Sequence, residues 1–221
     1  MELRYEEVRP NATYAPWLED ADFQAAHLAV HHNTMVDHLR LFELWRLVEQ
    51  AVRLPGDIIE VGVWRGGSGC LMARRAAMLG SDAQVFLCDT FAGVVKTGEK
   101  DTVYVDGEHS DTSYEIAKDL SESMGLDNVH LLAGIFPDDT GARVQDRQFS
   151  LCHIDVDVYQ SALDVLEWVW PRMPVGGIVV YDDYGFDRCG GITRLVNSRV
   201  GLDGSVTIHN INGHAVVVKT A

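Results

Sequence analysis

The fold is decided by residues 57–68, which read DIIEVGVWRGGS. The apolar run 58–61, with a single acidic residue, is typical of a buried strand in a parallel sheet. The glycine-containing segment that follows it predicts a tight turn, and residues 68–79 predict a helix that ends at Gly80. Strand, turn and helix in this order predict the first unit of an α/β domain.

The same alternation continues along the chain. Apolar runs predict further strands at 85–88, 129–132, 149–154 and 178–181, and helical periodicity predicts helices at 114–124, 161–170 and 192–199. An Asn-Gly pair separates two β-rich runs at 205–209 and 214–219, which predicts a hairpin. We therefore expect a Rossmann-like α/β fold, with a mostly parallel sheet and a C-terminal antiparallel hairpin.

The N-terminal region differs from this pattern. The first ~20 residues contain Pro10 and Pro16 and predict an extended arm, whereas residues 22–52 have helical periodicity up to Pro55-Gly56. We expect residues 1–54 to form an arm and a helical lid or extension, and residues 55–221 to form the main domain. Residues 93–112 predict a polar loop.

Composition narrows the class of protein. The chain has 221 residues, 33 of them acidic and 18 basic, and its formal charge is −15. Such a surface repels nucleic acid and anionic lipid, so we expect neither as a partner. No apolar run approaches the ~20 residues of a membrane span. The four cysteines form no Cys-x-x-Cys pair, which predicts reduced, mostly buried thiols in a cytoplasmic protein.

The turn after the first strand predicts a cofactor site. Glycines let the backbone approach a ligand closely, and the helix N-terminus behind them favours a carboxylate or phosphate. Gly62 is followed by Val63 and Trp64, which is not the dinucleotide fingerprint. An acidic residue at the strand end, Glu60, suits the positively charged aminoacyl part of S-adenosylmethionine. A tight turn without a ligand is the alternative.

Asp89 ends the second strand, about 29 residues after Glu60. A carboxylate at this position can accept both ribose hydroxyl groups of an adenosine. The alternative is that Asp89 caps the turn that follows it.

Four carboxylates follow the fourth and fifth strands. Asp155 and Asp157 come after the fourth strand, and Asp182 and Asp183 come after the fifth. Neighbouring strands of a doubly wound sheet open on the same crevice, so these groups would meet and repel one another. A bound cation, Mg²⁺ or Mn²⁺ rather than Ca²⁺, would relieve that repulsion. Asp182 and Asp183 can share it only if the chain has left the strand. Alternatively, these aspartates cap loops and helices.

The chain resembles the macrocin and mycinamicin type of sugar O-methyltransferases over residues 33–197. The most specific match is DVDVYQS at 155–161, then the glycines at 176–177, DDYG at 182–185 and Cys189. Residues 60–67 and 89–93 match the cofactor motifs of that family. The resemblance implies a class I methyltransferase domain at residues 55–221, and a homo-oligomer.

The resemblance also implies roles for individual residues. It makes Asp155, Asp182 and Asp183 the metal ligands, and Asp157 the catalytic base, with His153 as a second candidate. The expected cofactor residues follow the first three strands and are Glu60, Gly62, Trp64, Arg65, Gly66, Gly67, Ser68, Asp89, Thr90 and Gly134.

The expected function is methyl transfer from S-adenosylmethionine to a hydroxyl of a sugar or other small acceptor, preferably one of a vicinal pair. The metal would stabilise the alkoxide. Two alternatives remain: a metal-dependent O-methyltransferase of a catechol-like aromatic, and a module that binds S-adenosylmethionine without catalysis. A dehydrogenase is disfavoured by the turn sequence.

Overall fold

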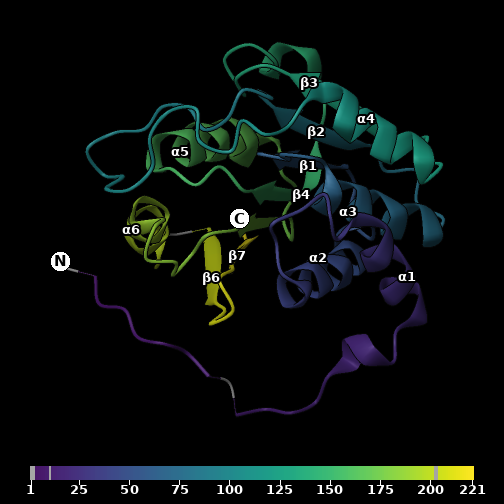
Figure 1. The fold of residues 1–221 in the computed structure, drawn as a ribbon, viewed down its shortest axis with the longest axis horizontal. Coiled ribbons are helices and arrows are strands. Elements are labelled where there is room, and N and C mark those ends of the chain that lie inside the picture. The colour runs from purple at the N-terminus through teal and green to yellow at the C-terminus, as the bar shows by residue number, and fades with distance from the viewer. Residues whose placement is uncertain (1–2, 10, 202–203) are drawn as a thin grey trace.

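The structure, a computed structural model, describes residues 3–9, 11–201 and 204–221. Within these residues seven strands form one sheet in the order β3-β2-β1-β4-β5-β7-β6 (Figure 1). Its strands are β1 (Asp57–Val61), β2 (Val85–Asp89), β3 (Val129–Ala133), β4 (Phe149–Ile154), β5 (Ile178–Tyr181), β6 (Ser205–His209) and β7 (Ala215–Lys219). The first five strands pair in parallel, and β7 is antiparallel to both β5 and β6. The predicted Rossmann-like fold is confirmed.

Helices cover both faces of the sheet. They are α1 (Ala21–Val30), α2 (His38–Ala51), α3 (Gly67–Met78), α4 (Tyr114–Ser123), α5 (Tyr159–Val169) and α6 (Gly190–Arg199), with short 3₁₀ turns at Pro16–Leu18, Gly141–Val144 and Trp170–Arg172. One apolar core joins α1, α2, α3 and part of α4 to the sheet, and a second core joins α5 and α6 to the other face (Figure 1). Alternating residues of each strand contribute to the two cores, because successive side chains point to opposite faces of the sheet.

The strand order places the site. The order reverses between β1 and β4, and ligands of open α/β sheets bind in the crevice at such a switch point. There the residue after β4, Asp155, donates its backbone N–H to Val61 at the end of β1 at 2.9 Å. The residue after β5, Asp182, donates in the same way to Ile154 of β4 at 2.9 Å. The ends of β1, β4 and β5 are thereby held side by side.

The predicted helical stretch 22–52 is two helices rather than one. α1 ends at Val30, and the connection 31–37 turns the chain before α2 begins. Asp37 caps α2 by accepting the backbone N–H of Leu39 at 2.8 Å, which is the usual way for a short acidic side chain to begin a helix. The periodicity continued across the break because both helices bury apolar faces against the same core.

The N-terminal region therefore has two parts. Residues 3–9 and 11–15 of the arm form no helix or strand and are mostly exposed; the arm passes along the outside of the molecule (Figure 1), and Leu3 and Tyr5 lie close to Gly190 at the start of α6. Helix α2, in contrast, is packed on α3 through fully buried Leu41, Leu44 and Trp45. The division at residue 54 remains a prediction.

Two further expectations concern membrane-spanning helices and the cysteine thiols. In the described part of the chain, no helix combines the length and the apolarity that a membrane span requires. All four cysteines are free and buried, as predicted.

Candidate functional site

A cavity of about 240 Å³ opens at the carboxyl ends of β1, β4 and β5. Its walls come from the connection 34–36 between α1 and α2, from residues 61–64, 88–90 and 134–136 at the ends of β1, β2 and β3, from residues 93–95, Tyr104 and His109 of the long loop, and from residues 186–189 before α6. The polar end of the cavity carries Asp155, Asp157, Asp182 and Asp183. The predicted cofactor turn and the predicted acidic cluster therefore line a single space.

Asp89 organises the turn after β1. One carboxylate oxygen accepts the backbone N–H groups of Val63 and Trp64, both at 2.8 Å, and the other accepts that of Phe91 at 2.7 Å. Burial raises the pKa of Asp89, although these three hydrogen bonds oppose the shift. Since Oδ2 accepts two N–H groups and Oδ1 accepts only one, Oδ1 keeps a lone pair that can accept a ribose hydroxyl. The geometry is thus compatible with both roles considered for Asp89.

The cofactor residues divide into two groups. Six of them line the cavity: Gly62, Trp64, Ser68, Asp89, Thr90 and Gly134. The other four, Glu60, Arg65, Gly66 and Gly67, are absent from its lining.

Each of these four has a partner elsewhere. The N–H of Gly67 donates to Asn33 at 2.9 Å and the N–H of Gly66 to Val63 at 2.6 Å, so neither helix-end N–H is available to a ligand. The guanidinium of Arg65 pairs with Asp111 at 2.9 Å. Glu60 is fully buried and bonds to His153. The direct contacts of these four residues with the cofactor stay a prediction.

The three predicted metal ligands converge. One carboxylate oxygen each from Asp155, Asp182 and Asp183 can be chosen so that all lie within 4.8 Å of one another. Asp183 has a φ of 64°, so the chain has left the extended conformation of β5. The two adjacent aspartates can consequently face the same space, which a regular strand would forbid.

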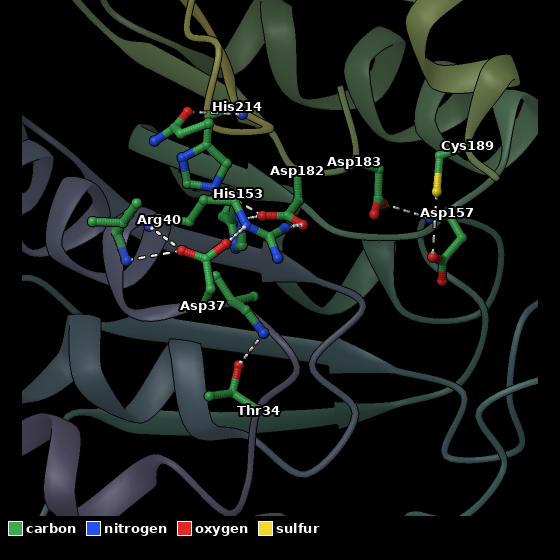
Figure 2. A network of polar contacts seen from close by, with 12 residues as sticks. Thr34, Asp37, Arg40, His153, Asp157, Asp182, Asp183, Cys189 and His214 are labelled. Atoms are coloured by element: carbon green, nitrogen blue, oxygen red, sulfur yellow. Dashed lines mark hydrogen bonds and ion pairs between the residues drawn. The ribbon is translucent and has the colours of Figure 1, made fainter. Parts of the chain in front are cut away.

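The charge of this cluster is only partly balanced. Burial, followed by repulsion from the neighbouring carboxylates, raises the pKa of Asp155 and of Asp183 well above the ordinary value. Asp182 differs, because it contacts Arg40 and His214, with His153 3.5 Å away (Figure 2). Although burial alone would raise its pKa, the two histidines and Arg40 lower it strongly. Three basic side chains therefore stand beside Asp182, which no motif in the sequence indicated.

His153 is unsuited to the role of base that was considered for it. Its ring is fully buried, and Nδ1 lies 2.7 Å from Glu60. Burial alone would lower its pKa, but contacts with Asp182 and Glu60 outweigh burial and raise it to about 10. A ring that keeps its proton at neutral pH cannot accept another one.

Asp157 faces a separate part of the acidic end. Its φ of 64° departs from the extended backbone of a strand, so the regular alternation of side chains in a strand does not apply to it. It shares a group of close ligand atoms with Asp183 and Cys189, whose sulfur lies 3.9 Å from its carboxylate (Figure 2). Burial raises its pKa, while a hydrogen bond from Tyr104 lowers it. The net shift is upward, which makes it a stronger base when it is ionised.

The structural alternative for Asp157 is not supported. Helix α5 begins at Tyr159, and no side chain caps it from Val158. The N–H of Tyr159 instead donates to Asp101 in the long loop at 2.9 Å. Asp157 therefore does not serve as the helix cap.

Sequence reasoning missed several residues of the cavity and its surroundings. Arg40 and Tyr104 line the cavity without belonging to any motif, as does Phe186, and His214 stands behind Asp182 in the terminal hairpin. The sequence held one weak signal: arginine in an apolar helix face and histidine at the start of an apolar strand are unusual in a core unless paired.

Comparison with known proteins agrees with this geometry. The family model for macrocin O-methyltransferase (TylF) matches residues 12–218. Mycinamicin III 3''-O-methyltransferase of Micromonospora griseorubida is 31% identical over 210 residues, which cover 88% of this chain and 82% of that protein. A 4'-O-methyltransferase of a rhamnosyl-tetracenomycin from Streptomyces olivaceus is 34% identical over 197 residues, covering 83% and 74%.

Solved structures give the same result. The O-methyltransferase NovP superposes with a TM-score of 0.74 at 26% identity, over 86% of this chain and 83% of that one. The calicheamicin methyltransferase CalS11 shares the fold, with a TM-score of 0.71 at 17% identity over 99% and 98%. On the family match over most of its length, and on the site just described, the chain belongs to the macrocin O-methyltransferase family of S-adenosylmethionine-dependent enzymes.

Proposed function

We propose that this enzyme methylates a hydroxyl group of a sugar or another small natural product, with Mg²⁺ or Mn²⁺ held by Asp155, Asp182 and Asp183. One observation carries the proposal: these three carboxylates share a single cavity with Gly62 and Asp89. The two reactants of a methyl transfer must meet within one site, and here the methyl-donor end and the acidic end are continuous.

The cavity suits S-adenosylmethionine at the end nearest β1 and β2. Gly62 and Gly134 present bare backbone to it, and Oδ1 of Asp89 keeps one lone pair that a ribose hydroxyl could use. We assign Trp64, Ser68 and Thr90 to the same end. Glu60, Arg65, Gly66 and Gly67 shape the turn from behind and are proposed as supporting residues.

The acidic end suits a hard divalent cation. All the donors of the three-aspartate group are carboxylate oxygens, and the raised pKa values of Asp155 and Asp183 reflect a charge that a cation would neutralise. When bound, such a cation supplies Lewis acidity that lowers the pKa of an acceptor hydroxyl.

The chain's own residues accept the proton and orient the acceptor. Asp157 takes the hydroxyl proton, since it lines the cavity, is buried and has a raised pKa. The apolar walls formed by Val36, Tyr104 and Phe186 exclude water and orient the acceptor. The rate gain comes mainly from positioning and charge stabilisation.

The acceptor class follows from the relatives and from the site. One relative is a 3''-O-methyltransferase of mycinamicin III, and another is a 4'-O-methyltransferase of a rhamnosyl-tetracenomycin C. A vicinal diol offers two oxygens to a cation that keeps open positions. The apolar wall at Met35, Val36 and Phe186 also suits an aromatic ring, so a catechol-like acceptor is the second candidate.

Location and partners are two further parts of the proposal. Four free, buried cysteines support a cytoplasmic enzyme, and the formal charge of −15 supports an enzyme that acts without a nucleic-acid partner. Family membership supports a homo-oligomer, which light scattering of the purified chain would test. A non-catalytic binding module is disfavoured because all four aspartates of the acidic end are present.

The direct test uses S-adenosylmethionine labelled on its methyl group. Transfer is measured to glycosides that carry a vicinal diol, to matched glycosides with that diol blocked, and to catechol. We expect transfer to the diol glycosides only, loss of transfer after exhaustive chelation, and recovery on addition of Mg²⁺. Full activity after chelation would refute the metal requirement, and transfer to catechol alone would favour the second candidate.

A further inference from the structure

Arg40 is a buried cation at the acidic end of the cavity. It lies on α2 with its side chain only 8% exposed. Its Nε donates to Asp37 at 2.9 Å, and its Nη1 donates to Oδ2 of Asp182 (Figure 2). The guanidinium also sits 4.9 Å from the ring centre of Phe186. Burial of an arginine is costly unless it is paired, so this arrangement is a built feature of the site.

The positive charge of neighbouring side chains is distributed unevenly over the three aspartates. Within the described residues, ion pairs are found for Asp182, with Arg40, His153 and His214, but for neither Asp155 nor Asp183. The protein therefore balances the charge of one carboxylate by itself and leaves the other two to repel each other.

A divalent ion in the same place would compete with this arginine. It would share the carboxylate of Asp182, whose Oδ2 Arg40 already uses, and it would stand close to a second positive charge. Like charges repel strongly in an environment shielded from water. The hairpin turn also lies close to the arginine stem, because a Cβ added at Gly213 would lie 3.3 Å from Cδ of Arg40.

Arg40 also connects the acidic end to the rest of the cavity wall. Helix α2 is preceded by the connection 31–37, in which Thr34, Met35 and Val36 line the cavity. The same connection accepts the N–H of Gly67 at Asn33, next to the cofactor turn. A shift of Arg40 would thus change the structure at both the acidic end and the cofactor turn.

We propose that Arg40 is a built-in counter-ion of the acidic cluster, which pairs with Asp182 in the ion-free protein and competes with the divalent cation for that carboxylate. It is a positioning residue that couples occupancy by the cation to the start of helix α2. The inference rests on the cation site of the proposed function.

Binding of Mn²⁺ tests the proposal without a known acceptor. The loss of the free-ion signal in electron paramagnetic resonance gives the affinity for the full-length wild type, for Arg40→Gln, and for Arg40→Lys as the charge-preserving control. Titration with S-adenosylhomocysteine shows whether each variant keeps a folded cofactor site. We expect Arg40→Gln to bind Mn²⁺ about ten-fold or more tightly than wild type, the size of effect that neighbours of metal ligands produce. Arg40→Lys should remain near wild type.

The gain in affinity is diagnostic, because a merely structural defect would weaken binding. Equal or weaker binding by Arg40→Gln, with wild type binding normally, overturns the inference alone. If neither protein binds Mn²⁺, the cation part of the proposed function fails and the inference with it. Binding by the variant only supports both.

A measurement on the wild type covers the case in which Arg40→Gln does not fold. Amide hydrogen exchange is followed with and without Mn²⁺. Release of Arg40 from Asp182 should raise exchange in the first turn of α2, and the exposed turn at Gly125 serves as the reference. Unchanged exchange in α2 at saturating Mn²⁺ would count against the coupling.

Discussion

Gly62 and Asp155 touch through their backbones: a Cβ atom on Gly62 would lie 1.7 Å from the carbonyl oxygen of Asp155. This contact joins the cofactor turn after β1 to the acidic end after β4. The φ of +88° at Gly62 also belongs to the left-handed region that glycine adopts without strain. A single glycine therefore keeps the two halves of the site in register.

We predict that Gly62→Ala disrupts both halves. The strand ends must separate, so the affinity for S-adenosylhomocysteine should fall at least ten-fold and stability should fall by more than about 2 kcal/mol. The control is Gly125→Ala, where φ is +66° but no atom lies within 4 Å of the added Cβ. That variant should show only the backbone strain of about 1 kcal/mol. Calorimetry and thermal melting measure both quantities, and equal losses in the two variants would contradict the contact.

We predict that Asp89→Ala weakens S-adenosylhomocysteine binding at least ten-fold. The carboxylate both shapes the turn, through Val63 and Trp64, and offers the remaining lone pair of Oδ1 to the ribose. A double cycle with the 2'-deoxy analogue separates these effects. A ribose contact predicts that the analogue loses affinity in wild type but not in the variant. Equal losses of affinity in both proteins would mean that Asp89 shapes the turn but does not contact the ribose.

We predict that Asp157→Asn lowers kcat by a factor on the order of 10²–10⁴, the usual size of a general-base contribution. Mn²⁺ and cofactor affinity should change little. Because burial raises the pKa of Asp157, the acid limb of the wild-type pH profile should lie above the ordinary aspartate pKa of about 3.9, and the variant should lose that limb. Normal kcat with an unchanged acid limb would remove Asp157 from the mechanism, and a collapse of Mn²⁺ affinity would make it a ligand.

The carboxylates of Asp155 and Asp183 predict how stability depends on pH. Their folded-state pKa values are raised by burial and then by mutual repulsion, so above the ordinary pKa the native protein binds more protons than the unfolded chain. Stability of the ion-free protein should therefore fall as pH rises from about 4 through the folded-state values.

Mg²⁺ should reverse this trend, because it replaces the protons. Its effect on the melting temperature should grow with pH, and calorimetry in buffers of different ionisation enthalpy should reveal proton release on binding. Asp183→Asn is the control and should flatten both dependences. A shift in melting temperature by Mg²⁺ that is the same at every pH would argue against carboxylates with raised pKa values at the site.

The sequence by itself determined the sheet and the kinds of groups at its edge. The bounds of β1 and β2 fell within one residue of the prediction, those of β4 and β5 matched it, and the Asn-Gly hairpin formed as expected. Apolar runs, turns and strand alternation are local features that can be recognised in the sequence without knowledge of the fold. The rule that parallel strands share a carboxyl edge then brought Asp155, Asp182 and Asp183 together without any coordinates.

Only the tertiary structure decided which side chains meet at that edge. Arg40 reaches Asp182 across 142 positions of sequence, and His214 reaches the same carboxylate from the hairpin. Gly67 turned out to face Asn33 rather than a ligand. No periodic pattern in the sequence predicts these long-range contacts, because they depend on how α2 and β7 pack against β5. The left-handed φ of Asp157 likewise follows from the turn that the packed chain must make, which the spacing of Asp155 and Asp157 in the sequence does not reveal.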